Sequence, residues 1–171
     1  MIAGCRPSWP TAWRSACELA VAAAILAACA GGAGLSAQSV AFVDHGTTQQ
    51  SANDDGPRIA VAATPEATGL EQLAAGRPAE AGRLYVGVFA GTQRTGGYGV
   101  RVDAIERSGD RLVVRATLSA PAPGVLTIQV ITSPAQLVSI ASAAASGARE
   151  AVLVDQSGSE RARTTVPQSQ P

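Results

Sequence analysis

The only histidine of the chain, His45, stands next to Asp44 in a polar stretch that also holds Asp54 and Asp55. An imidazole beside carboxylates is a combination that binds metal ions or transfers protons in general acid–base catalysis. A structural interpretation competes with this one, because a single histidine in a polar loop commonly serves a turn. A zinc site of the common kind also needs further histidine or cysteine ligands. We therefore predict neither a metal site nor a catalytic residue here.

Other catalytic patterns are absent from the sequence. All 13 basic residues are arginine, so there is no lysine for a P-loop, a Schiff base or a Ser–Lys pair. No G-x-S-x-G motif occurs, and no apolar setting surrounds the carboxylates in a way that would raise their pKa. The formal net charge is zero and no basic run exists, which excludes a nucleic-acid footprint. We expect a protein that is not an enzyme, with no cofactor and no small-molecule ligand.

A glycine-rich stretch, residues 91–99, is the local feature that most resembles a binding site. Two interpretations of it stay open. In one, glycines with positive φ present a rigid tyrosine to a partner. In the other, the glycines form a tight turn and the tyrosine fills the core. A phosphate cradle is excluded, because no lysine follows the glycines. The predicted partner-binding residues are Arg94, Thr95, Gly96, Gly97 and Tyr98.

The N-terminal segment has the pattern of a secretory signal. Arginines precede an apolar run at residues 19–28, which is too short to span a membrane but typical of a signal peptide. Leu26-Ala27-Ala28-Cys29 resembles the bacterial lipobox, in which Cys29 is diacylated and becomes the new N-terminus. The same site also fits ordinary signal peptidase, which would release a soluble periplasmic or secreted protein. We expect residues 1–29 to be a signal peptide and residues 30–39, rich in Gly, Ala and Ser, to be a flexible tether.

Removal of the signal peptide would leave a mature protein of unusual composition. The three cysteines and both tryptophans lie at or before Cys29. The mature protein would therefore have no disulfide or cysteine nucleophile, and its stability would depend on an aliphatic core.

The remaining pattern predicts a mainly β protein: a small antiparallel β-sandwich or partly open barrel of about seven to eight strands with one short helix. An α+β sheet is the alternative. The helix is predicted between Thr64, as its cap, and Gly76. From residue 156 onward the composition predicts a disordered tail. Strands are predicted at residues 40–43, 58–62, 84–89, 98–107, 111–118, 126–132, 136–140 and 151–154.

Period-two patterns predict how three of these strands are buried. Residues 84–89 alternate between aliphatic and aromatic side chains, so both faces of this strand should be covered. In the hairpin 98–118, pairing of Arg107 with Arg111 would place Asp103 opposite Arg115 and leave an exposed apolar pair. Residues 126–132 should point their aliphatic side chains inward. The exposed pair is Ile105 with Val113, and the inward residues are Leu126, Ile128 and Val130.

Residues 83–140 resemble the C-terminal domain of the protease complex subunit PrcB family. The resemblance rests on Gly91, on the stretch Arg94-Thr95-Gly96-Gly97-Tyr98 leading into Val100-Arg101-Val102, and on the turn Pro121-Ala122-Pro123-Gly124. The run Ile131-Thr132-Ser133-Pro134 completes it. The sequence departs from the family pattern at Ala135 and Gln136, where an aromatic residue and a histidine are common. The Thr-Gly-Gly-Tyr stretch is also similar to a loop of chagasin-type cysteine-protease inhibitors.

The resemblance implies an exported, non-catalytic bacterial protein that associates with a secreted serine-protease complex and stabilises it. We expect residues 40–155 to form this PrcB-like domain, anchored in the cell envelope by a lipid on Cys29. It would bind and stabilise or modulate another exported protein, with a protease as the candidate. Two alternatives stay open: a structural surface lipoprotein without a dedicated partner, and a chagasin-like inhibitor.

Overall fold

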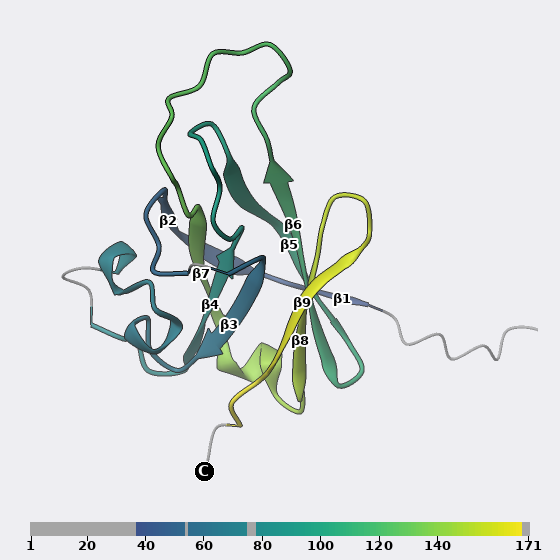
Figure 1. Cartoon of the computed structure of the whole chain (residues 1–171). Coiled ribbons are helices and arrows are strands. Elements are labelled where there is room, and N and C mark those ends of the chain that lie inside the picture. Colours follow the sequence, from purple (N-terminus) through teal and green to yellow (C-terminus); the bar gives the residue numbers. More distant parts are fainter. Residues whose placement is uncertain (1–36, 54, 75–77, 169–171) are drawn as a thin grey trace, which may run out of the picture. The chain divides into compact units, whose positions relative to one another are not determined.

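The computed structural model of the chain describes residues 37–53, 55–74 and 78–168 (Figure 1). The predicted signal peptide with Cys29, and nearly all of the predicted tether, lie outside these residues. The described part contains three 3-10 turns, η1 (Glu66–Thr68), η2 (Glu71–Leu73) and η3 (Ser142–Ala145). Its strands are β1 (Gln38–Val40), β2 (Phe42–Thr48), β3 (Arg58–Ala62), β4 (Arg83–Phe89), β5 (Gly99–Ser108), β6 (Arg111–Ser119), β7 (Ala135–Ala141), β8 (Glu150–Val154) and β9 (Glu160–Thr165).

The strands form two sheets that do not close into a barrel. One sheet has the order β1-β5-β6-β8-β9 and the other the order β2-β7-β4-β3. All neighbouring strands are antiparallel except β6 and β8. The chain passes from the first sheet to the second at Ala41, between β1 and β2. The predicted mainly β architecture of the sandwich type is confirmed.

Aliphatic side chains from both sheets form the main core, and β4 is covered on both of its faces. Leu84, Val86 and Val88 point into the main core between the sheets. Tyr85 and Phe89 point the other way and join a second cluster. This alternation is the one that the sequence predicted. Both faces of β4 must be covered because its side chains on each face are large and apolar.

The predicted helix is wrong: its place is taken by the two short turns η1 and η2. Gly69 has a φ of 82°, in the left-handed region, and this ends η1 after one turn. The segment still has a core function, because Leu70 is fully buried against Tyr85 and Phe89. The turns therefore cover the second face of β4 without forming an α-helix.

The hairpin of β5 and β6 has a register that changes in its middle. Val102 pairs with Ala116, as expected, but a β-bulge between Val102 and Ala104 shifts every later pair by one residue. The shift turns Ile105 into the core, where it is 1% exposed and faces Val114. The prediction of an exposed Ile105–Val113 pair, and of Asp103 opposite Arg115, is therefore wrong.

Two further predictions are corrected at the C-terminal half. The tail predicted to be disordered contains β9, which pairs with β8. Its polar composition suits an edge strand, and Arg163 of β9 bonds Glu150 and Glu160. Residues 126–131, predicted to be a strand with inward side chains, belong to a loop whose aliphatic side chains are exposed.

Candidate functional site

His45 serves the fold of the four-stranded sheet. It lies in β2, not in a loop, and its Nε2 is 2.8 Å from the Oγ of Ser139 on β7. That hydroxyl also accepts a hydrogen bond of 3.0 Å from Nε of Arg83 on β4. Ser139 is fully buried, so it offers no nucleophile to a substrate. The contact connects three strands of one sheet.

Among the described residues, Asp44 and Asp55 do not form a metal-binding group with His45. Oδ1 of Asp44 accepts a hydrogen bond from the backbone of Gly46, Asp55 is exposed, and Asp54 lies outside the described residues. Within the described ranges, no three histidine, cysteine or acidic side chains come together as a metal site would require. The arrangement supports neither of the two chemistries considered for this stretch.

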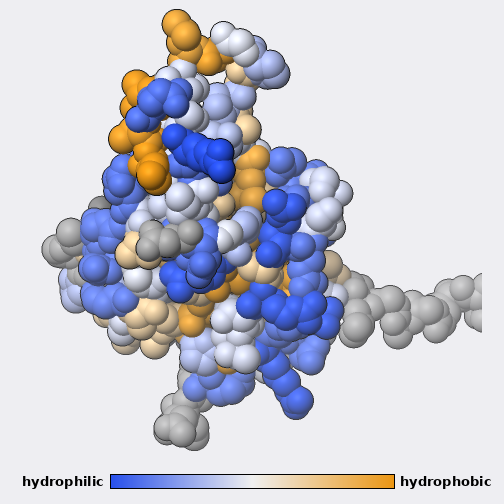
Figure 2. All heavy atoms as spheres, in the orientation of Figure 1, coloured by the Kyte–Doolittle hydropathy of each residue, from blue (hydrophilic) through white to orange (hydrophobic). Residues whose placement is uncertain are grey.

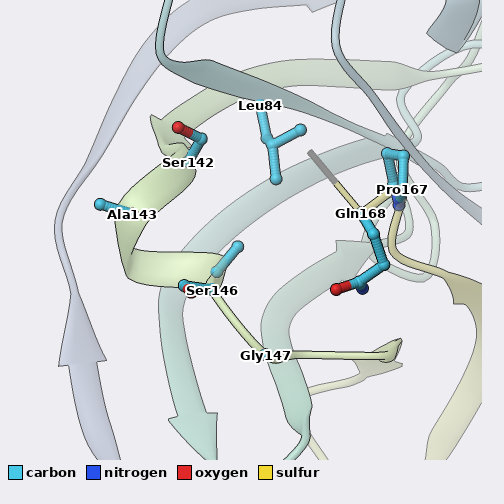
Figure 3. Close-up of a pocket in the computed structure, with 8 residues that line it drawn as sticks. Leu84, Ser142, Ala143, Ser146, Gly147, Pro167 and Gln168 are labelled. Carbon is cyan, nitrogen blue, oxygen red and sulfur yellow. The ribbon is translucent and has the colours of Figure 1, made fainter. Parts of the chain in front are cut away.

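The pocket beside η3 supports catalysis no better than the surroundings of His45 do. It has a volume of about 230 Å³ and lies between η3, the start of β4 and the end of the described chain (Figure 3). Nε2 of Gln168 donates hydrogen bonds to the carbonyls of Ala148 and Val166 at its wall. None of the described residues around it is titratable: they are Leu84, Ser142, Ala143, Ala145, Ser146, Gly147, Pro167 and Gln168.

Most charged side chains of β5 and β6 lie in ion pairs. Arg115 bonds both carboxylate oxygens of Glu106, at 3.1 and 3.2 Å, and this hydrogen-bonded carboxylate raises the pKa of Arg115. Nε of Arg101 lies 2.8 Å from Asp103. Three of the four arginines on these two strands therefore lie in ion pairs.

The main exposed apolar region is the loop between β6 and β7, residues 120–131, which we call the apolar loop. It projects beyond the ends of β5 and β6 (Figure 1), and hydrophobic side chains gather there at the surface (Figure 2). Exposed contiguous apolar surface of this kind marks interaction sites in soluble proteins. Five large side chains are exposed, by 43% at Val130 to 100% at Leu126; the others are Val125, Ile128 and Ile131.

The predicted binding stretch at residues 91–99, which we call the glycine loop, lies directly against the apolar loop. The backbone N–H of Gly96 donates to the carbonyl of Ile128 at 3.0 Å. Gln93 and Thr132 exchange two backbone hydrogen bonds, of 2.7 and 3.0 Å. The Thr132 hydroxyl also donates to the carbonyl of Thr95. The glycine loop and the apolar loop, which the sequence pattern predicts as separate elements, therefore form one structural unit.

Close contacts explain why this loop contains glycine. A Cβ on Gly96 would lie 2.8 Å from Cγ1 of Ile128. Gly97 has a φ of 89°, and a Cβ there would lie 3.2 Å from Cβ of Pro121. A side chain at either position would therefore press the apolar loop away from the glycine loop.

The exposure of Tyr98 tests the interpretation in which this residue fills the core. Tyr98 precedes β5, is half-buried and belongs to neither core cluster, so the interpretation in which it fills the core is wrong. Arg94 is exposed, and Thr95 is half-buried beneath Thr132. Contact with a partner through this loop stays a prediction.

The two positions at which the sequence departs from the family pattern lie in the interior of the molecule. Ala135 and Gln136 are both buried. Oε1 of Gln136 accepts a hydrogen bond of 2.6 Å from the backbone N–H of Val102, at the β-bulge of β5. Gln136 thus satisfies a backbone donor at the point where the bulge interrupts the ladder. These positions are not part of an exposed contact surface.

Comparison with known proteins gives one family. Residues 84–141 match the family model described as PrcB C-terminal. The match runs from β4 to the end of β7 and includes both loops, and it confirms the resemblance recognised in the sequence. It suggests a non-catalytic protein associated with a protease complex. No curated protein and no solved structure gives a significant match. Among the described residues, no helix has the length and hydrophobicity needed to cross a membrane.

Proposed function

We propose that this chain, with its PrcB C-terminal segment, is an exported, non-catalytic protein that binds another protein of the cell envelope through the apolar loop and the glycine loop. A secreted protease is the candidate partner, which the chain would stabilise or modulate. Cys29 would carry the lipid that holds the chain at the membrane. The proposal is supported by the family match and by the signal pattern of residues 1–29.

The exposed aliphatic side chains of the apolar loop carry this proposal. Leu126 is fully exposed, and Ile128 and Ile131 are more than two-thirds exposed. Full burial of one such side chain contributes about 1.5–3 kcal/mol of free energy, which is not gained while the side chain stays in water. The hydrogen bonds to the glycine loop fix the base of this region, so little ordering would be required when a partner covers it.

Export and processing can be tested separately from binding. Both tryptophans, Trp9 and Trp13, precede Cys29. Protein purified from the cell envelope should therefore show tyrosine emission only. A tryptophan band would show that the signal segment is retained. Mass spectrometry of the new N-terminus distinguishes a diacylated Cys29 from ordinary signal-peptidase cleavage.

The binding proposal is tested by a crosslinked pull-down from the envelope, with Leu126→Ser/Ile128→Ser beside the wild type. The matched control is Val43→Ser, because Val43 is an exposed aliphatic residue on β2, outside both loops. We expect the wild type and the control to capture the same exported protein and the loop variant to lose it. Equal capture by all three proteins would show that the loops are not the contact.

Assays on the captured protein then show whether the chain stabilises it or inhibits it. If it is a protease, its half-life and its rate on a peptide substrate are measured with and without the purified chain. A longer half-life at an unchanged rate indicates a stabiliser. A lower rate indicates an inhibitor of the chagasin-like kind. An empty capture from every sample would favour a structural lipoprotein domain.

A further inference from the structure

The apolar loop has one edge paired and one edge free. Its paired edge faces the glycine loop, through the bonds of Ile128 and Thr132. Within the described part of the chain, no backbone hydrogen bond is donated by the N–H groups of residues 126–131. In an extended chain, successive residues direct these groups to opposite edges. Those of Thr127, Gln129 and Ile131 are therefore available to a further strand.

This free edge lacks the protection that other edges of the molecule have. Edge strands of monomeric proteins are commonly protected by charged side chains, prolines or bulges. The edge strand β9 carries Arg161 and Arg163, and the edge strand β2 has a bulge between Asp44 and Gly46. Residues 125–131 (Val-Leu-Thr-Ile-Gln-Val-Ile) have neither charge nor proline and are rich in β-branched residues. A segment of this composition pairs readily with another strand.

The charge of the two loops restricts what can cover them. Arg94 is the only charged residue in residues 91–99 and 119–133. It is exposed, and it takes part in no ion pair with another described residue. A second copy of the chain would bring a second Arg94 to the contact and no carboxylate. A segment with a carboxylate beside its apolar residues complements the surface better.

Both loops lie at the end of β5 that is opposite to the end paired with β1. Gln38 pairs with Arg107 at one end of β5, whereas both loops leave the sheet at the other end, where Gly99 pairs with Ser119. The strand between these two ends is roughly 26 Å long, at about 3.3 Å per residue.

We propose that the partner supplies an extended segment with alternating aliphatic side chains and a nearby carboxylate, and that this segment adds as a strand to the free edge of residues 125–131. The backbone groups of Thr127, Gln129 and Ile131 pair with it. The exposed aliphatic side chains pack against its apolar face, and Arg94 binds its carboxylate. This inference rests on the proposed function and specifies the kind of partner.

The test uses the mature chain and a fluorescent probe peptide, Glu-Val-Thr-Val-Thr-Val, with binding followed by anisotropy. Two further probes carry N-methyl groups on one or the other alternate set of backbone amides. An added strand bonds through one edge only, so one methylation pattern should weaken binding by at least about tenfold while the other leaves it unchanged. Equal affinity for all three probes would overturn strand addition, as would the absence of binding by the unmodified probe at millimolar concentration.

A charge reversal tests the role of Arg94. Arg94→Glu should weaken binding of the glutamate probe and restore binding to a probe with lysine in its place. Arg149→Glu is the matched control, because Arg149 is exposed next to β8 and should leave both affinities unchanged. Affinities independent of Arg94 would contradict the proposed carboxylate contact.

Three controls separate the alternatives. Sedimentation of the chain alone should show a monomer; a dimer lost in Leu126→Ser would identify a second copy as the occupant. Binding to anionic vesicles that depends on Leu126 would identify a lipid surface. Either result overturns the inference. If the pull-down partner is retained and no probe binds, only strand addition fails; if the loop variant also keeps the partner, the proposed function fails as well.

Discussion

Replacing Gly91 by alanine should destabilise the folded part of the chain by about 2–5 kcal/mol. Gly91 has a φ of 79°, and a side chain in this left-handed region costs about 1–2 kcal/mol. A Cβ there would also clash with the carbonyl oxygen of Asp55 and lie 2.7 Å from the carbonyl carbon of Gly56. Both are backbone atoms, so the neighbouring segment must move, which adds about 1–3 kcal/mol.

The assay is thermal unfolding followed by circular dichroism, with Gly124→Ala as the matched control. Gly124 has a φ of 81°, and a Cβ there would meet no other atom within 4 Å. The control should therefore lose only the stability that the left-handed conformation costs, about 1–2 kcal/mol or roughly 3–10 °C of Tm. For Gly91→Ala we expect a fall in Tm of roughly 6–25 °C, at about 3–5 °C per kcal/mol. Equal losses in the two variants would refute the close approach of residues 55–56 to Gly91.

Three further outcomes follow from the structure. Gln136→Leu should cost about 1–3 kcal/mol in urea unfolding, because it leaves the N–H of Val102 buried without its acceptor. The hydroxyl of Ser157 lowers the pKa of Asp155 by hydrogen bonding, so this carboxylate stabilises the fold above its unfolded-state pKa and loses that effect as pH falls through its folded-state pKa. The stability difference between wild type and Asp155→Asn should accordingly be present at neutral pH and vanish in acid. Leu126→Ser should change the free energy of unfolding by less than about 0.5 kcal/mol, because Leu126 is fully exposed.

The parts of the fold that could be predicted depend on local patterns with a clear burial consequence. The alternation in β4 predicted two covered faces, because large aliphatic and aromatic side chains on opposite faces leave no face for solvent. The hairpin of β5 and β6 was also predictable, from two apolar runs around Ser108-Gly109-Asp110. Its bulge was not, because the buried Gln136 that accepts the freed N–H of Val102 comes from a strand more than 30 residues away in sequence.

The predictions were wrong for elements that depend on tertiary context. Strand β9 has the composition of a disordered tail, but its pairing with β8, the bonds of Arg163 and the packing of Ala162 against the main core stabilise it. The predicted helix had a suitable cap and an acidic first turn, but Gly69 in its middle adopts a left-handed conformation. Burial of Leu70 then determines the course of the chain more than helix propensity does.

Of the two loops that form the candidate site, only the glycine loop could be predicted from the sequence. The glycine-rich stretch was recognisable, because glycines beside a tyrosine stand out in the sequence. The alternation of residues 126–132 predicts an inward-facing strand, because the residues of a half-buried strand alternate in this way. Pairing of the apolar loop with the glycine loop, through Gly96 and Ile128, leaves no core for Leu126 to enter. Sequence periodicity alone does not reveal which side of an extended segment is covered.

The central claim is that the apolar loop contacts another exported protein, and crosslinking in living cells tests it most directly. A photo-reactive benzophenone side chain is placed at the position of Leu126 and, as a control, at the position of Asp110, in the exposed turn between β5 and β6. We predict a crosslinked product, containing one exported protein, from position 126 and none from position 110. The same products from both positions, or none from position 126, would contradict the account.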